Sequence, residues 1–157
     1  EFRRVLFRSV TSRIAGLFSR RGYNMDSITG GVTENPDITR VTVVVHGEEA
    51  VLEQVTKQLS KLEDVIEIEE LEPGTSVCRE LILVRVAVNE IQRPEVVSVA
   101  DIFRANVVDV AKNSLMIELT GDASKLDAFL ELLTGYEILG IARTGLTGLC
   151  RGSAVKK

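Results

Sequence analysis

The first half of the chain carries apolar residues at helical and then at strand spacing. A stripe that recurs every three or four residues predicts a helix ending at Gly22, a residue that tolerates the positive φ of a helix end. Its members are Val10, Ile14, Leu17 and Phe18. YNMDSITGGVT, the turn ENPD and the β-branched run ITRVTVVV follow, and together they predict a β-hairpin over residues 23–45.

A second helix and a strand are predicted after this hairpin. Apolar residues at helical spacing cover residues 48–61, and the alternation in VIEIEEL predicts a strand over residues 65–71. The next residues, LEPGTS at 71–76, are typical of a turn. We therefore expect a domain boundary here, with a first domain at residues 10–72 and a linker at residues 73–77.

The second half, residues 78–157, repeats the same order of elements. It predicts a strand in RELILVRVAV, a helix over 94–105, strands in NVVDVA and SLMIELT, a helix capped by Asp122 and a strand in YEILGIARTG. Residues 43–59 also align without gaps on residues 117–133, and AGLF upstream aligns with ADIF. The pattern predicts an α+β protein with two ferredoxin-like (βαββαβ) domains in tandem, the first lacking a normal first strand.

Composition argues against two classes of partner. No apolar run approaches 18 residues, so no membrane span is predicted. Residues 1–21 carry a formal charge of +5, whereas residues 22–157 carry −9 and would repel a phosphate backbone. Aromatic residues make up only 4%, with no Trp, which leaves few platforms for base stacking. We therefore expect no nucleic-acid partner and no membrane.

The sequence lacks the common catalytic and metal-binding motifs. GxSxG, Walker A and GxGxxG are absent, and His46 has no nucleophile or metal ligand at a suitable spacing, which favours a surface loop residue. The glutamates of residues 67–72 follow no Ca²⁺-loop pattern and predict a solvated strand face. Cys78 and Cys150 are expected to be reduced thiols in the cytoplasm, a disulfide in an oxidising compartment being the alternative. The chain is thus expected to have no catalytic site, metal or cofactor of its own.

Recognition of a small molecule by backbone and amide groups remains. Free N–H groups at a helix N-terminus can hold a carboxylate. Asn24 follows the first predicted helix, and its amide can accept a hydrogen bond from an α-ammonium and donate one to a carboxylate. The alternative is that Asn24 is a turn residue beyond the helix end. The residues alone leave both interpretations open.

Long strings of the sequence resemble one known family. RIAGLFSRRGYNMDSITGG, the hairpin with ENPDITRVTVVV, and VLEQVTKQLSKLEDVIEI resemble the small regulatory subunit of acetolactate synthase (acetohydroxyacid synthase). VADIFRANVVDV, SLMIELTGDASKLDAFLELL and ARTG resemble the C-terminal domain of the same family. The resemblance extends over residues 10–153.

This resemblance implies a fold, a ligand and a partner. It implies an N-terminal ACT domain that pairs in a homodimer and binds a branched-chain amino acid, usually valine, at the dimer interface. It also implies a separate catalytic subunit, carrying thiamine diphosphate, Mg²⁺ and FAD, which the non-catalytic small subunit activates and subjects to feedback inhibition. The alternative is a free-standing ACT-type amino-acid sensor that regulates another enzyme or a transcription factor.

The resemblance also implies the residues of the effector site. Asn24 matches the family's effector-contacting Asn, and Met25 matches an apolar residue that lines the same site. Ser12 and Arg13 match the start of the first helix, near the effector loop, and Gly31 matches a small-residue position beside the pocket.

The first nine residues depart from the family's pattern. The family begins with a strand and a loop of the type ENxPGVL, whose Asn and Gly receive the effector carboxylate, whereas this chain reads FRRVLFRSVTS, with Ser9 in place of the Gly. EFRRVLFRS can be back-translated into a sequencing-library adapter, so we expect residues 1–9 to be a non-native segment. An unusual first strand with Arg facing out, a transit peptide and a basic arm for nucleic acid are the alternatives.

Overall fold

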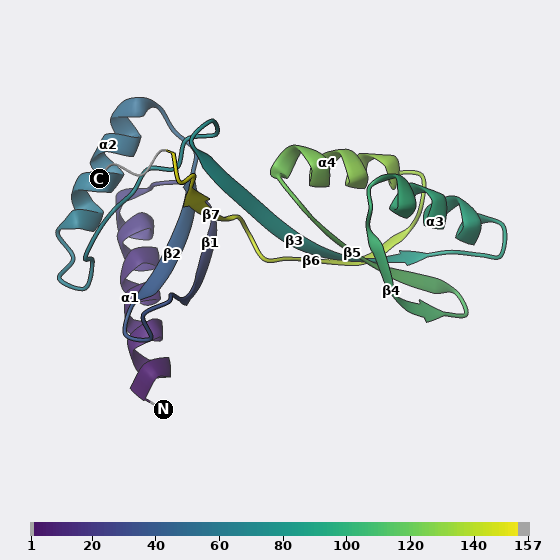
Figure 1. Cartoon of the computed structure of the whole chain (residues 1–157), viewed down its shortest axis with the longest axis horizontal. Helices are drawn as coiled ribbons and strands as arrows, with labels where there is room; N and C mark the ends of the chain where they lie inside the picture. The colour runs from purple at the N-terminus through teal and green to yellow at the C-terminus, as the bar shows by residue number, and fades with distance from the viewer. Residues whose placement is uncertain (1, 154–157) are drawn as a thin grey trace. The chain divides into compact units, whose positions relative to one another are not determined.

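The computed structural model describes residues 2–153, with side chains from residue 11 onward, and divides them into two compact units (Figure 1). Unit 1 extends to Thr75, and unit 2 begins at Ser76. Glu1, in the expected non-native segment, and residues 154–157, in the expected second domain, lie outside the described residues. The predicted α+β class of two ferredoxin-like domains is confirmed, with two sheets and four helices in the described part of the chain.

Unit 1 packs two helices on a two-stranded antiparallel sheet, and the predicted hairpin is confirmed. Its elements are α1 (Phe2–Arg21), β1 (Met25–Val32), β2 (Thr39–Val45) and α2 (Glu49–Ser60). Ile14 and Phe18 of α1 and Val55 of α2 form the buried core, against which half-buried side chains of the hairpin pack. The apolar stripes of both helices therefore face the same small sheet.

The first helix is longer than the apolar stripe predicts. α1 begins at Phe2 rather than near Val10, so the segment considered above as an unusual first strand is helical. Residues 2–15 contain no Gly or Pro that would stop a helix, and Arg, Leu and Ala favour helical backbone. The absence of a normal first strand in unit 1 agrees with the prediction.

Unit 2 contains every element of the repeat. The elements are β3 (Ser76–Ala87), α3 (Gln92–Ile102), β4 (Asn106–Ala111), β5 (Ser114–Gly121), α4 (Ala123–Leu132), β6 (Ile138–Arg143) and β7 (Thr147–Cys150). The strand order is β4-β5-β3-β6, with antiparallel neighbours, and β7, which was not predicted, pairs with the start of β3.

The core of unit 2 lies between its sheet and its two helices. α3 and α4 cover the same side of the sheet (Figure 1), and their apolar side chains enclose Ile82, Val84 and Val86 of β3. As predicted, Asp122 caps α4, because its Oδ1 accepts a hydrogen bond from the backbone N–H of Lys125 at 2.9 Å. No helix in the described part of the chain is long and apolar enough to cross a membrane.

The strand predicted at residues 65–71 does not form, and unit 2 supplies the reason. In the order β4-β5-β3-β6 the fourth strand of the repeat pairs only with the first strand, β3. The described residues of unit 1 include no first strand, so residues 65–71 lack a neighbouring strand for their backbone groups and remain irregular. Ile66, expected on a strand, is 80% exposed.

The structure retains the internal repeat, but it aligns the first helix of unit 1 with that of unit 2 differently from the alignment of AGLF with ADIF. α1 and α3 are each followed by a residue with positive φ, Gly22 at 67° and Arg104 at 56°. The next N–H donates to the carbonyl five residues earlier, at 3.1 Å after α1 and 2.8 Å after α3. When the two helix ends are aligned, Gly22 corresponds to Arg104, and Phe18 therefore corresponds to Ala100 instead of Phe103. Phe18 and Ala100 are both buried, which supports this alignment.

A partly buried ion pair joins two strands of unit 2. Glu80 of β3 is 7% exposed and accepts hydrogen bonds from Nε and Nη2 of Arg143 at 2.9 and 3.0 Å. These hydrogen bonds, aided by the guanidinium charge, lower the pKa of Glu80. The carboxylate form therefore stabilises the folded state.

We expect Glu80→Gln to lower the free energy of unfolding by about 1–2 kcal/mol at pH 7, a value reduced by the partial exposure of Arg143. Because the folded pKa of Glu80 is below its unfolded value of about 4.3, the stabilisation is complete above that pH and is lost as the pH falls through the folded pKa. Urea unfolding at pH 7 and in steps towards about pH 3 should show the gap closing. Exposed Glu90→Gln is the control; an equal gap at every pH would contradict the prediction.

Candidate functional site

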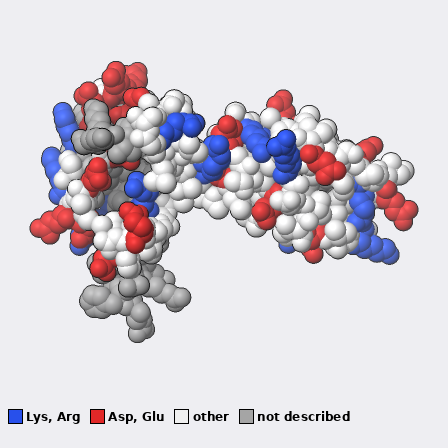
Figure 2. All heavy atoms as spheres, in the orientation of Figure 1, with Lys and Arg blue, Asp and Glu red and all other residues white. Residues whose placement is uncertain are grey.

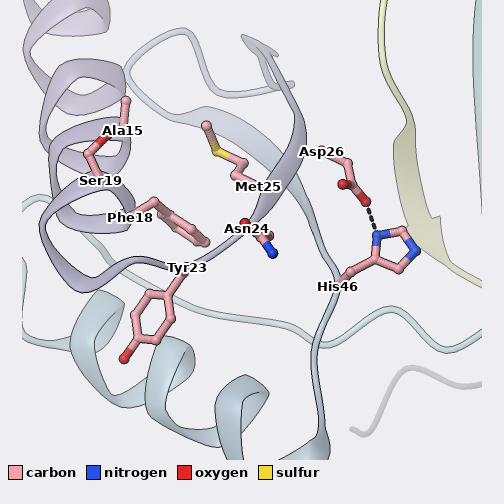
Figure 3. Close-up of a pocket in the computed structure, with 8 residues that line it drawn as sticks. All are labelled: Ala15, Phe18, Ser19, Tyr23, Asn24, Met25, Asp26 and His46. Atoms are coloured by element: carbon pink, nitrogen blue, oxygen red, sulfur yellow. Dashed lines mark hydrogen bonds and ion pairs between the residues drawn. The ribbon is translucent and has the colours of Figure 1, made fainter.

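Unit 1 contains a hollow of about 480 Å³ where the end of α1 meets the start of β1 and the end of β2. Figure 3 shows Ala15, Phe18 and Ser19 projecting from α1 on one side of Asn24, and Asp26 and His46 on the other. The full lining consists of Ala15, Phe18, Ser19, Tyr23, Asn24, Met25, Asp26 and His46.

The turn after α1 positions the polar side chains of the hollow. Gly22, with its φ of +67°, reverses the chain at the helix end, and β1 begins after only Tyr23 and Asn24. A residue with a side chain would be strained in this conformation. The short connection therefore keeps Asn24 between α1 and the sheet.

The floor of the hollow is apolar and is part of the core of unit 1. Phe18 is 2% exposed, and its ring meets the ring of Tyr23 edge-on, with centroids 5.9 Å apart. The hydroxyl of Tyr23 donates a hydrogen bond to Oε1 of Gln54, on α2, at 3.3 Å. The floor is thus connected to both helices and cannot shift independently of the core.

A β-bulge turns a carboxylate towards an imidazole beside Asn24. Met25 pairs with Val45 and Ser27 pairs with Val44, so Asp26 is the additional residue of the bulge. Its carboxylate contacts Nδ1 of His46 (Figure 3), and both side chains are largely exposed. Because both side chains are exposed, both groups remain accessible to a ligand.

Unit 2 has the same bulge without these polar groups. The register shift in β4 lies between Val107 and Asp109, so Val108 is the counterpart of Asp26. Thr120 is the counterpart of His46 in the alignment of the second part of the repeat. The bulge lies opposite Val44 and Val45, directly before His46, in unit 1, whereas in unit 2 it lies opposite Met116 and Ile117, three residues before Thr120. The carboxylate–imidazole pair therefore belongs to unit 1.

The structure brings two of the five expected effector residues together. Asn24 and Met25 line the hollow, whereas Ser12, Arg13 and Gly31 do not belong to its lining. Arg13 forms an ion pair with Asp64, which connects α1 to the loop after α2. Gly31 pairs with Arg40 near the far end of β1, with open space where a Cβ would stand, and Ser12 is exposed.

The sequence did not identify the other six lining residues, which are Ala15, Phe18, Ser19, Tyr23, Asp26 and His46. His46 was predicted to be a surface loop residue, and it is exposed, but it also contacts Asp26. The register of the hairpin is the signal that joins the two, because it sets the start of β1 opposite the end of β2. The bulge at Asp26 leaves no mark in the hydrophobic pattern.

The chemistry of the hollow suits a small zwitterion. The amide of Asn24 can donate to a carboxylate, the carboxylate of Asp26 can accept from an ammonium, and the apolar floor can contact an aliphatic side chain. In the described part of the chain no three His, Cys, Asp or Glu side chains converge on a metal position. Among the described side chains, the groups with shifted pKa values all lie in unit 2, and these are Glu80, Asp122, Tyr136 and Arg143.

A second hollow, of about 310 Å³, lies at the start of α3 in unit 2. Asn89 occupies the helix N-terminus, because its Oδ1 accepts from the N–H groups of Ile91 and Gln92 at 3.0 and 2.8 Å. The N–H groups that could hold an anion are therefore already bonded there.

Comparison with known proteins assigns both units to one family. Residues 79–152 match the family described as small subunit of acetolactate synthase, and residues 10–67 match the AHAS small subunit-like ACT domain. The chain is 50% identical over 145 residues to the probable acetolactate synthase small subunit of Methanothermobacter thermautotrophicus, covering 92% of this chain and 86% of the relative. It is 46% identical over 143 residues to the acetolactate synthase small subunit of Mycobacterium bovis, covering 91% and 85%.

A solved structure agrees with this assignment. The crystal structure of the acetolactate synthase small subunit from Thermotoga maritima matches with a TM-score of 0.82 and 37% identity, over 90% of this chain and 89% of that chain. The chain belongs to the family of acetolactate synthase small subunits.

Proposed function

We propose that this chain is a regulatory subunit that activates the catalytic subunit of acetolactate synthase and mediates its feedback inhibition by a branched-chain amino acid, with valine as the first candidate. The observation that carries the proposal is the hollow of unit 1, where Asn24 and the Asp26–His46 pair surround an apolar floor. Membership of the small-subunit family, with an ACT domain at residues 10–67, supports a regulatory role.

The proposal includes partners and compartment. The effector domain is residues 10–72 and the second domain residues 78–157; the effector domains pair in a homodimer in the cytoplasm. The separate catalytic subunit carries thiamine diphosphate, Mg²⁺ and FAD, and this chain performs no chemistry. Figure 2 is consistent with a protein partner rather than nucleic acid, since acidic side chains lie among the basic ones on the face shown.

The helix at the front of unit 1 affects the strength of effector binding. Ser9 stands where the family has the Gly of its carboxylate-binding loop, and α1 begins at Phe2. Inside a helix the backbone N–H groups donate to the carbonyls of the preceding turn, so they are not available to a ligand. We therefore expect the remaining part of the site to bind valine weakly.

The proposed function makes Asn24 necessary for valine binding. Addition of valine up to about 50 mM should shift amide signals of the hollow in an ¹H–¹⁵N NMR titration, with a Kd in the millimolar range. Asn24→Ala should abolish these shifts, because the amide is the group placed to bind the carboxylate. Asn106→Ala, the aligned Asn in unit 2, is the matched control and should titrate like the wild type. Shifts that survive Asn24→Ala would show that the site is assigned wrongly, whereas submicromolar binding by the unchanged chain would contradict the expected weak affinity.

The second prediction separates the proposal from a free-standing amino-acid sensor. Mixing the chain with the acetolactate synthase catalytic subunit of the same organism should raise the rate of acetolactate formation. An equal concentration of albumin is the control for nonspecific stabilisation of the enzyme. We expect activation even where valine binding is weak, since effector binding and activation are separate properties. A catalytic subunit whose activity does not respond would rule out the proposed role.

A further inference from the structure

We propose that His46 controls how tightly the hollow of unit 1 binds an amino acid, because the charge of its imidazole determines how strongly the Asp26 carboxylate attracts the ligand's ammonium group. This role rests on the proposed function, in which the hollow binds an amino-acid effector, and it makes that binding depend on pH. The contact between Nδ1 of His46 and Oδ2 of Asp26 carries the proposal (Figure 3). The imidazole lies against the group that would bind the ammonium.

The fold does not require this contact. The side chains of His46 and Asp26 are 80% and 44% exposed, and ion pairs between exposed groups contribute little to stability. A bulge also forms in β4, where Val108 is the additional residue and offers no carboxylate. The Asp26–His46 contact can therefore change when a ligand binds without disturbing the backbone.

Among the described residues, three titratable side chains line the hollow, and these are Tyr23, Asp26 and His46. The hydroxyl of Tyr23 is directed to α2, where it donates a hydrogen bond to Oε1 of Gln54. Asp26 supplies the carboxylate of the lining. His46 supplies an imidazole, a group that changes its charge in proteins between about pH 5 and 8.

Four charged side chains adjoin the hollow along the chain, and these are Arg20 and Arg21 at the end of α1 and Glu48 and Glu49 at the start of α2. The two guanidinium groups donate to the carbonyl of Gly16 and to Oε1 of Gln58, and a guanidinium group keeps its proton at these pH values. The two acids are exposed, and exposed carboxyl groups are ionised in this range. A dependence on pH is therefore expected to come from His46, the single histidine of the chain.

The two charge states of His46 have opposite effects on an ammonium group. A neutral imidazole with its proton on Nδ1 donates a hydrogen bond to Asp26 and leaves the carboxylate its charge and further lone pairs. A protonated imidazole compensates that charge and repels a second cation at the same carboxylate. Binding of an amino acid should therefore strengthen as the pH rises and His46 loses its proton.

Valine is the probe, because it stays zwitterionic between about pH 5.5 and 7.5, a range in which imidazoles titrate. NMR titrations of the full chain should give a Kd about threefold higher at the lower pH than at the higher one. The ring signals of the single histidine should also move towards their neutral positions when valine is added at about pH 6. By linkage, a ligand that prefers the neutral form increases its population.

Two variants assign the effect to the pair. His46→Asn places an amide N–H near the position of Nδ1 but cannot take up a positive charge, so it should bind valine equally at both pH values, with the affinity of the wild type at the higher pH. Asp26→Asn should weaken binding at the higher pH by about threefold and remove most of the pH dependence. Glu48→Gln, outside the lining, is the matched control and should follow the wild type.

Asn24→Ala, measured at the higher pH, separates the role of His46 from the proposed effector site. Valine shifts that survive this change, or the absence of valine binding at every pH, would overturn the site and the role of His46 together. Binding that requires Asn24 but has the same Kd at both pH values, or is tighter at the lower pH, would overturn the role of His46 alone. A pH dependence that persists in His46→Asn would likewise place the responsible group elsewhere.

Discussion

The complete sheet of the repeat depends on its first strand, because in unit 2 that strand pairs with both the third and the fourth strand. In unit 2, β3 lies between β5 and β6, and its inward side chains Ile82, Val84 and Val86 are fully buried. Unit 1 lacks this strand, and two consequences follow. Its sheet has only β1 and β2, and residues 65–71 remain irregular despite an alternating sequence. One missing pairing partner therefore explains the main departures from a complete fold.

Two local backbone features, the turn after the first helix and a bulge in the next strand, occur in both units. The lining of the hollow belongs to unit 1. The turn after the first helix recurs at Gly22 and Arg104, and the bulge recurs at Asp26 and Val108. What distinguishes unit 1 is the side chains placed on this shared backbone, above all the ring of Phe18 in place of Ala100. The side chains on this backbone give unit 1 a carboxylate–imidazole pair above an aromatic floor, which the corresponding residues of unit 2 do not provide.

The sequence predicted those parts of the fold that depend on neighbouring residues. The hairpin, the four helices and the cap at Asp122 follow from local pattern and turn chemistry. The strand at 65–71 was wrongly predicted because alternation records a face to be buried and carries no information about a distant partner. β7 was missed because TGLC has no alternation over a useful length. In the site, Asn24 could be identified from its place directly after the helix. Asp26 could not be identified, because the bulge places it, and His46 could not, because only the hairpin register brings it beside Asp26.

The same strand connects the free edge of unit 1 to its hollow. β2 ends at Val45, and His46 follows it directly, so the strand that lacks an outer neighbour also holds one wall of the site. The hollow needs β1 and β2 in register to bring Asp26 to His46, so a change that disorders β2 would also disturb the geometry of the site.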